Sequence, residues 1–352
     1  MLQVGIVGLP NVGKSTLFKT LTKKQVDCAN FPFCTIEPNV GVVEVPDERM
    51  QQLADISHAA KIIPTAIEFV DIAGLVKGAH KGEGLGNKFL SNIRTVDMIV
   101  HVVRAFDDTN VHHVDGSVDP VRDVETIETE LAMADIDTVE RRLNNVQSKL
   151  KAGKTKDLEN EESAMKKLFE AVSQGKLANT VELTQDEEAT IKDLLLLTRK
   201  PILYVVNVAE DSATKTFPLT PSISLSVKIE SELVDMPPEE QKEFLHELGL
   251  EQSGLDRLIK KCYESLNLIT YFTSGEKETR AWTIKRGTKA PQAAGVIHTD
   301  FEKAFIRAEV IAAKDFIEFG GEAGARDVGK FRVEGKEYVM QDGDVVHFRV
   351  GV

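Results

Sequence analysis

Short apolar runs, bounded by glycine or by acidic residues, recur along the chain. They lie at residues 2–7, 65–70, 98–103 and 202–206. A short and mostly apolar run is typical of a strand that is buried on both faces. Helical stretches separate these runs, and the first of them spans residues 15–21. The alternation predicts an α/β fold in which a parallel sheet carries helices on both faces.

The spacing of apolar residues changes after Asp119-Pro120, where Asp can cap a helix and Pro suits its first turn. Apolar residues then recur at mostly three- and four-residue steps, which predicts one long amphipathic helix. They are Val124, Ile127, Leu131, Val139, Leu143, Val146 and Leu150. Gly153 marks a break after this helix.

A second helix follows the break, and it carries apolar residues on one side. These are Met165, Leu168, Phe169 and Val172. Two such helices joined by a short loop form an antiparallel hairpin. A capping-box pattern at residues 184–187 then predicts the start of a third helix. Residues 119–200 are therefore predicted to be a helical insertion within a first domain made of residues 1–118 and 201–269.

From about Thr270 the chain is rich in short β-type runs, such as residues 281–284 and 330–333. Turn signals such as Asp342-Gly343 separate them. Residues 300–307 are expected to be the one helix of this part. Residues 270–352 therefore predict a small α+β domain.

Composition narrows the class of protein. The chain has 352 residues, of which 42% are hydrophobic and 28% charged, and its net charge is −13. Two or three soluble domains are expected at this length, and any contact with nucleic acid must come from a local basic patch. No apolar run reaches the length of a membrane span, and no secretory signal is expected. The three cysteines have no metal-type spacing, so free thiols in a reducing cytosol are expected.

The strongest motif is G-x-x-x-x-G-K-[ST], which residues 8–15 match between a predicted strand and a predicted helix. Its glycines let backbone N–H groups surround phosphate oxygens, its lysine contacts the β- and γ-phosphates, and its hydroxyl binds Mg²⁺. We expect Lys14 to face solvent until phosphate arrives. The residues predicted to bind the nucleotide here are Asn11, Val12, Gly13, Lys14, Ser15 and Thr16.

A D-x-x-G motif at Asp71 to Gly74 follows the second predicted strand. Asp71 is expected to hold Mg²⁺ through water, and the Gly74 N–H to sense the γ-phosphate. Thr35, in a polar loop between the two motifs, is a further candidate Mg²⁺ ligand. Leu75 stands where Ras-like enzymes carry a water-orienting Gln, so either hydrolysis is slow or another group positions the water. His113 is a candidate for that role, although a surface histidine pair with His112 is the alternative.

Base recognition is expected after the fourth strand. GTPases place N-K-x-D there, whereas this chain has Asn207-Val208-Ala209-Glu210. Losing the Lys and lengthening Asp to Glu should disturb the paired contact with guanine, which favours adenine. The second base-contacting loop is expected at Ser226 and Val227.

Basic residues gather around the tip of the predicted hairpin. They are Arg141, Arg142, Lys149, Lys151, Lys154 and Lys156, with no acidic residue between them. Such a tip can meet RNA phosphates, or it can be a solvated helix end. Trp282, within a second small basic stretch, is a core residue or a platform for base stacking.

Together these motifs resemble the YchF-type Obg-like ATPases. The resemblance rests on residues 8–15, 71–79 and 207–210 and on the C-terminal stretch 290–301, and it covers essentially the whole chain. It implies a Ras-like nucleotide domain, a coiled-coil insertion and a C-terminal TGS domain of β-grasp type. It also implies a preference for ATP over GTP, slow hydrolysis and association with ribosomes.

Two site residues gain support from the resemblance. The family replaces the catalytic Gln by a hydrophobic residue, as Leu75 does. The resemblance also implies that a histidine after the third strand takes part in hydrolysis. His113 is the matching position, and the neighbouring His112 is the alternative. Residues 31–35 match the family's switch I segment, which supports Thr35.

The sequence therefore predicts a cytoplasmic, monomeric, Mg²⁺-dependent ATPase that acts as a switch on ribosomes or RNA. The ribosome or RNA contact is expected at the hairpin tip and the TGS domain. The alternatives are an Obg-class GTPase, which Asn207 to Glu210 disfavours, and a nucleotide-gated binding module with negligible turnover, which Leu75 supports.

Overall fold

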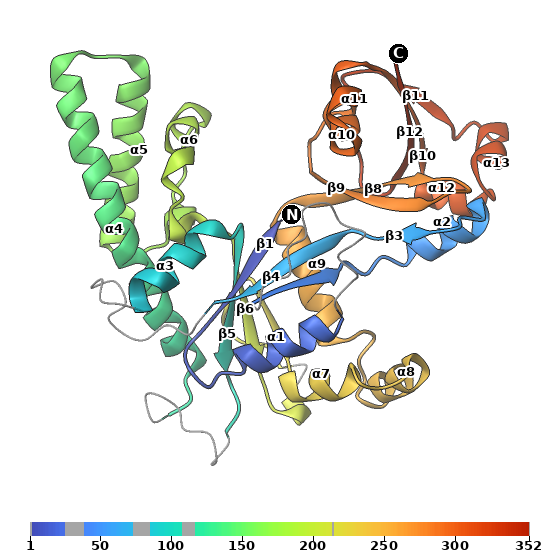
Figure 1. The fold of residues 1–352 in the computed structure, drawn as a ribbon. Coiled ribbons are helices and arrows are strands. Elements are labelled where there is room, and N and C mark those ends of the chain that lie inside the picture. The colour runs from blue at the N-terminus through green and yellow to red at the C-terminus, as the bar shows by residue number, and fades with distance from the viewer. Residues whose placement is uncertain (1, 25–38, 73–84, 108–116, 213–214, 352) are drawn as a thin grey trace.

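The computed structural model describes residues 2–24, 39–72, 85–107, 117–212 and 215–351. The chain folds around two sheets, with a helical hairpin projecting beside the first (Figure 1). Among the described helices, none combines the length and the apolar character that crossing a membrane requires.

The first sheet has the strand order β2-β4-β1-β5-β6-β7. Its strands are β1 (Gln3–Val7), β2 (Val40–Glu44), β4 (Ala66–Asp71), β5 (Met98–Arg104), β6 (Ile202–Asn207) and β7 (Ser222–Leu225). The helices that accompany it are α1 (Lys14–Lys23), α3 (Leu85–Thr95), α7 (Val227–Leu233), α8 (Pro238–Glu247) and α9 (Gly254–Ser265). The α/β prediction and the strands β1, β4, β5 and β6 are confirmed, each within a residue or two of its predicted limits.

The prediction of a parallel sheet needs one correction. β2 runs antiparallel to β4, whereas the other neighbouring pairs of this sheet are parallel. The bond from Val45 N to Thr65 O, 2.9 Å long, closes the β2–β4 pair in the manner of a hairpin, so no crossover helix joins them on this sheet. β2 and β7 were not predicted.

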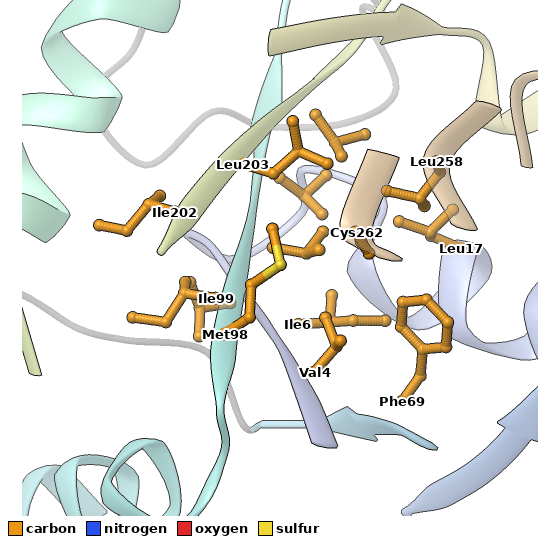
Figure 2. Close-up of a cluster of buried hydrophobic side chains, with 14 of the residues drawn as sticks. Val4, Ile6, Leu17, Phe69, Met98, Ile99, Ile202, Leu203, Leu258 and Cys262 are labelled. Carbon is orange, nitrogen blue, oxygen red and sulfur yellow. The ribbon is translucent and has the colours of Figure 1, made fainter. Parts of the chain in front are cut away.

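The core of the first domain lies between the sheet and its helices. Val4 and Ile6 of β1, Met98 of β5 and Leu203 of β6 are buried with Leu17 of α1 (Figure 2). Continuous apolar strands of this kind are what a sheet covered on both faces requires. This packing fixes the β1–α1 turn, which carries the phosphate-binding motif.

The helical insertion follows its predicted signals closely. The Asp119 carboxylate accepts from the N–H groups of Val121 and Arg122 and starts α4 (Pro120–Ala152), which ends at Gly153. α5 (Lys156–Ser173) returns antiparallel, and α6 (Gln185–Ile191) opens with the predicted capping box of Thr184 and Glu187. Short 3-10 helices lie at Ala178–Thr180, Lys192–Leu194, Leu197–Arg199 and Glu210–Ser212.

The long helix α4 belongs to two cores. Val124 and Ile127 in its first half are buried against the first sheet, whereas Val139 in its second half packs with Met165 and Leu168 of α5. Between the two halves, the buried Asp135 carboxylate accepts from Leu197 N at 2.9 Å and from Thr198 N at 2.8 Å. These bonds tie the middle of α4 to the segment that leads into β6.

The second sheet has the order β11-β10-β12-β8-β9-β3. Its strands are β3 (Ile62–Ile63), β8 (Leu268–Ser274), β9 (Thr279–Lys285), β10 (Phe305–Ala312), β11 (Arg332–Glu334) and β12 (Asp344–Val350). The helices packed with it are α2 (Arg49–Ser57), α10 (Ala290–Ile297), α11 (Thr299–Lys303), α12 (Ala313–Glu318) and α13 (Glu322–Asp327).

The prediction of one helix at residues 300–307 is wrong. α11 ends at Lys303, and the chain enters β10 at Phe305. β10 pairs antiparallel with β12 from Phe305 to Ala312, and these long-range hydrogen bonds outweigh the local preference of the segment.

α2 and β3 lie with the second sheet although they come from the first 118 residues. β3 pairs with Thr279 and Arg280 of β9, and Met50 and Leu53 of α2 are buried in a cluster with Phe272. The packing of α2 and β3 therefore differs from the predicted domain limits, which assign these residues to the first domain. The limits 1–118, 119–200, 201–269 and 270–352 stay a prediction.

Candidate nucleotide-binding site

The phosphate-binding loop joins β1 to α1 at the carboxyl end of the parallel strands. Gly8 and Gly13 have φ of 153° and 101°, a region that side chains rarely adopt. A Cβ on Gly8 would collide with the carbonyl oxygen of Val102, and one on Gly13 would lie 2.5 Å from Nδ2 of Asn207. The spacing of the two glycines in the motif is therefore set by how closely the loop approaches its neighbours.

Lys14 lies inside the loop. Its ammonium group donates to the carbonyl of Leu9 at 2.7 Å, and the residue is 7% exposed. Burial lowers the pKa of Lys14 to about 8, against the opposing attraction of Asp71. The expectation that Lys14 faces solvent is therefore wrong, because the loop carbonyl satisfies the ammonium group internally.

Asp71 and Ser15 supply the oxygen atoms that a Mg²⁺ ion would need. Asp71 ends β4 beside Ile6 of β1, and burial raises its pKa while Lys14 lowers it. Ser15 is exposed in the first turn of α1. A hydroxyl and a carboxylate are hard ligands that suit Mg²⁺, which keeps several waters and takes phosphate oxygens as its other ligands. The residues present therefore fit the ion.

Asn207 connects the phosphate loop with the second base loop. Its Nδ2 donates to the carbonyl of Val12 at 3.0 Å, and its Oδ1 accepts from the N–H of Val227 at 3.1 Å. The side chain is buried, so both bonds form out of water. Asn207 thus holds two loops in register, whereas the sequence suggested only a base contact.

A cavity of about 770 Å³ opens beside these loops. The predicted residues that line it are Asn11, Gly13, Thr16, Asn207, Val208, Glu210, Ser226 and Val227. The structure thereby brings together three segments that are far apart in sequence. Val12 and Lys14 are buried behind this cavity, and Ser15 and Asp71 are not among its lining residues.

Three further residues of the cavity were missed by the sequence reasoning: Phe106, Asp107 and Ser231. Phe106 follows β5, and the buried Arg104 fixes it by donating to its carbonyl at 3.0 Å and lying 4.5 Å from its ring centre. An aromatic ring beside a cavity offers a face on which a base can stack. The one available signal was an aromatic residue at the carboxyl end of a parallel strand.

The base loop differs in detail from the sequence expectation. Val208 is buried, and its N–H donates to the Leu225 carbonyl at 3.0 Å. The Glu210 carboxylate forms an ion pair with Lys228, and both side chains are more than half exposed. Ser226 caps α7 by accepting from Ile229 N. The carboxylate that would read a guanine is therefore engaged by a lysine.

Several predicted residues lie outside the described part of the chain. They are Thr35, Gly74, Leu75, His112 and His113, together with Cys28 and Cys34. Cys262 is a buried free thiol, and burial raises its pKa.

Comparison with known proteins identifies the family. A family model described as a 50S ribosome-binding GTPase matches residues 3–139. The relative in Bacillus subtilis named ribosome-binding ATPase YchF is 54% identical over 100% of both chains, and its namesake in Haemophilus influenzae is 52% identical over 99% of both. The chain belongs to the YchF family.

Two further findings agree with membership of the YchF family. The family model YchF-GTPase_C, described as a protein of unknown function (DUF933), matches residues 268–351. The solved structure of the Schizosaccharomyces pombe YchF GTPase is 40% identical, has a TM-score of 0.87, and covers 99% of this chain and 97% of that one. The expected nucleotide domain followed by a C-terminal YchF domain is therefore confirmed.

The bridging role of Asn207 gives a testable expectation. Replacing Asn207 with Ala leaves the Val12 carbonyl and the Val227 N–H without their partner, at a cost of about 1–3 kcal/mol for each buried group. We expect the affinity for a fluorescent ATP analogue to fall at least about tenfold, the equivalent of about 1.4 kcal/mol. Titration of the analogue measures this, and thermal unfolding records the loss of stability.

The matched control is Asn179→Ala, which removes one long bond of 3.4 Å to the Lys200 carbonyl on an exposed asparagine. It should leave the affinity unchanged. An Asn207→Ala protein that binds the analogue as tightly as the control does would contradict the bridging role.

Proposed function

We propose that this chain binds and hydrolyses ATP with Mg²⁺ and acts on the ribosome as a nucleotide-controlled switch. The observation that carries the proposal is the cavity in which the phosphate loop meets a base loop without N-K-x-D. The relatives' name, ribosome-binding ATPase, supports the same conclusion. Ribosomes place such a protein in the cytoplasm, where we expect it to act as a monomer.

Phosphate binding would use the groups that the loop already aligns. The N–H groups from Asn11 to Thr16 would surround the phosphates, and Lys14 would exchange the Leu9 carbonyl for a phosphate oxygen. A phosphate close to Lys14 favours its charged form, so the pKa of about 8 should rise when nucleotide binds. Ser15, Asp71 and Thr35 would hold Mg²⁺, which neutralises charge on the phosphates.

Base selection would follow from the chemistry at the far end of the cavity. Guanine needs a free carboxylate for its N1–H and exocyclic amine, and Glu210 is paired with Lys228. Val208 offers an apolar side chain where GTPases have Lys. Adenine lacks both guanine donors, so it loses nothing at this position, and Phe106 offers it a stacking face.

We therefore expect ATP to bind more tightly than GTP. A base donor that stays unpaired when the bound base is shielded from water costs about 1–3 kcal/mol. At about 1.4 kcal/mol per decade, this corresponds to a preference of about 5- to 150-fold. The double substitution Val208→Lys with Glu210→Asp should move the preference towards GTP. Competition of both nucleotides against a fluorescent analogue measures the ratio in both proteins.

The same titration decides between the two names in the family, since one relative is described as a GTPase and others as ATPases. Equal affinities in the wild type, or tighter GTP binding, would replace the ATPase proposal with an Obg-class GTPase. Val208→Lys alone is the control for added charge, and it should not create a preference for GTP.

For hydrolysis, we propose that His113 positions the attacking water and that the Gly74 N–H contacts the γ-phosphate. Leu75 cannot bond to water, so another side chain must do so. His113→Ala should lower kcat by about 100-fold while ATP affinity is kept, because the contact forms mainly in the transition state. His112→Ala is the matched control, and single-turnover assays on saturating ribosomes give the rates.

Two other results would be informative. A loss of affinity at unchanged kcat would make His113 a binding residue instead. Negligible turnover of the wild type on ribosomes would favour a nucleotide-gated binding module over an enzyme.

The ribosome contact is proposed at the hairpin tip and the C-terminal domain. Lys149, Lys151, Lys154 and Lys156 are exposed around the tip. Arg142 and Lys156 are different, because Arg142 pairs with Glu161 and Asp193 and Lys156 pairs with Asp186 at 3.4 Å. We therefore assign the contact with RNA phosphates to Lys149, Lys151 and Lys154.

Reversing charge at the tip should weaken ribosome binding. The pair Lys151→Glu and Lys154→Glu should reduce cosedimentation with ribosomes and lower the salt slope by about 1 for each lysine that contacts a phosphate. The matched control reverses Lys176 and Lys242, which are exposed away from the tip. ATP hydrolysis without ribosomes should stay unchanged in both. Equal cosedimentation of tip and control variants at low salt would leave the tip as a solvated helix end.

A further inference from the structure

A two-stranded stalk runs from the predicted Mg²⁺ site to the second sheet. β2 pairs with β4 from Val40–Val70 to Glu44–Ala66, and the bond from Val45 N to Thr65 O closes the pair. β4 ends at Asp71, so one end of the stalk lies at the nucleotide site. At the other end the chain leaves the first sheet and forms α2 and β3 (Figure 1).

The segment between β2 and β4, which we call the excursion, contains α2 and β3 and is built into the second sheet. Met50 and Leu53 of α2 are buried in one cluster with Phe272, Ala281 and Phe316. β3 extends the sheet beside β9. Backbone bonds of 2.9 Å from Thr279 N to the Lys61 carbonyl and from Ala60 N to the Glu276 carbonyl flank this pairing. α2 and β3 are therefore packed as parts of the second sheet.

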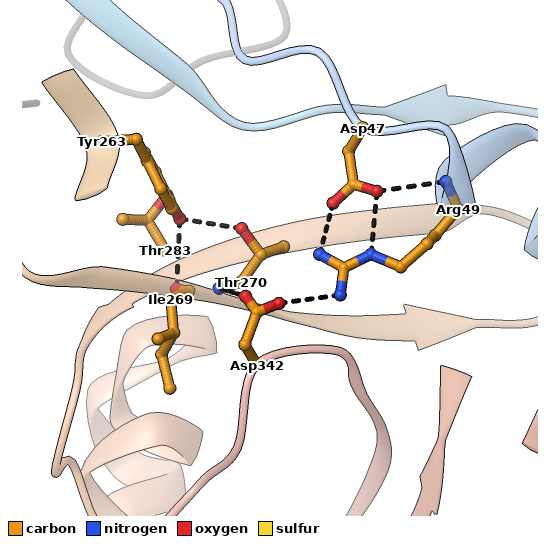
Figure 3. Close-up of polar contacts among 7 residues, drawn as sticks. All are labelled: Asp47, Arg49, Tyr263, Ile269, Thr270, Thr283 and Asp342. Atoms are coloured by element: carbon orange, nitrogen blue, oxygen red, sulfur yellow. Dashed lines mark hydrogen bonds and ion pairs between the residues drawn. The ribbon is translucent and has the colours of Figure 1, made fainter. Parts of the chain in front are cut away.

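Arg49 fastens the stalk to the sheet at the start of α2 (Figure 3). Its guanidinium donates to Asp47 through Nε at 2.9 Å and Nη2 at 2.7 Å, and to Asp342 through Nη1 at 2.8 Å. It also lies 5.0 Å from the ring centre of Phe272. Arg49 thus joins Asp47, which directly follows the stalk, to the loop before β12.

The covalent connection between the domains lies beside the Arg49–Asp342 contact, and we call this place the corner. α9 leads into β8, and the Tyr263 hydroxyl contacts Thr270 Oγ1 at 2.8 Å and donates to the Ile269 carbonyl at 3.1 Å. The N–H of Thr270 donates to Asp342 at 2.9 Å. Both attachments therefore meet at Thr270 (Figure 3).

We propose that this stalk couples nucleotide binding to the second sheet, with Arg49 and Asp342 as the positioning residues that transmit it. A displacement of Asp71 on binding Mg²⁺ and phosphates is carried along the β2–β4 pair, because paired strands are stiff along their length. The excursion is packed into the second sheet, so that sheet moves about the corner at Thr270. Coupling of this kind is reciprocal, and ribosome contacts made by the C-terminal domain then alter the nucleotide site.

The inference rests on the proposed ATP binding, and hydrogen–deuterium exchange on the full chain tests the two separately. Exchange is measured with and without a non-hydrolysable ATP analogue and Mg²⁺. In the wild type, the analogue should change exchange at the P-loop and also in α2, β8 and β9. In Arg49→Ala the P-loop response should remain, and the response of β8 and β9 should fall by at least about half, as expected when one of two attachments is lost.

Asp342→Asn is a second variant, which weakens the same link without removing the arginine. The matched control is Arg326→Ala, because Arg326 also pairs with one carboxylate, Glu322, and lies over an aromatic ring, Phe331, but within the C-terminal domain. It should keep the full response of β8 and β9. The difference with and without the analogue is the readout, so a variant that merely loosens the fold does not imitate the effect.

Three results would overturn the coupling. In the wild type, β8 and β9 could fail to respond while the P-loop does. Alternatively, both link variants could keep the full response, or the Arg326 control could lose it equally. An unresponsive P-loop in the wild type would instead contradict ATP binding itself.

Discussion

The carboxyl ends of β1, β4, β5 and β6 meet at one edge of the first sheet because these strands run parallel. That constraint places several of the described groups of the candidate site. β1 ends in the phosphate loop, β4 at Asp71, β5 just before Phe106 and β6 at Asn207. Parallel pairing of the strands thus makes neighbours of residues from distant parts of the sequence, without direct contacts between their side chains being needed. The buried bonds of Asn207 then set the spacing between the phosphate loop and the base loop.

Signals that act over a few residues could be read from the sequence. The phosphate motif, the Asp119 cap and the Thr184 capping box each depend on contacts within a few positions, and the structure has all three elements where they were expected. The glycines at positions 8 and 13 could likewise be recognised from the local motif. The steric reason why glycine is needed there lies in residues far away in sequence. The atoms that would collide with a Cβ belong to Val102 and Asn207, on other strands.

Most of what could not be predicted depends on partners far away in sequence, and the exception is Lys14, whose partner Leu9 lies in the same loop. The segment at 300–307 was expected to be helical, and pairing with β12 makes its end a strand. Lys14 was expected in solvent. Its ammonium group is instead buried in the loop, where it donates to the Leu9 carbonyl. Phe106 gives no motif, and it matters only because the cavity opens beside it. Glu210 was predicted to be part of a base-reading motif, whereas its partner Lys228 lies in the first turn of α7.

The helical hairpin and the second sheet are the two appendages of the first sheet. Both are attached at the edge that lies opposite the predicted nucleotide site. β2 is antiparallel to its neighbour, so it ends at the amino edge, and the excursion to the second sheet departs there. The Asp135 bonds hold the middle of α4 to the segment before β6, which lies at the same edge. The hairpin and the second sheet therefore lie on the same side of the first sheet (Figure 1). A six-residue strand such as β4 spans about 20 Å, at about 3.3 Å per residue. Any influence of the nucleotide on the hairpin or on the second sheet must therefore travel the length of the first sheet. β4 makes this crossing from the excursion to Asp71, α4 makes it towards the hairpin, and α9 leads into β8 of the second sheet.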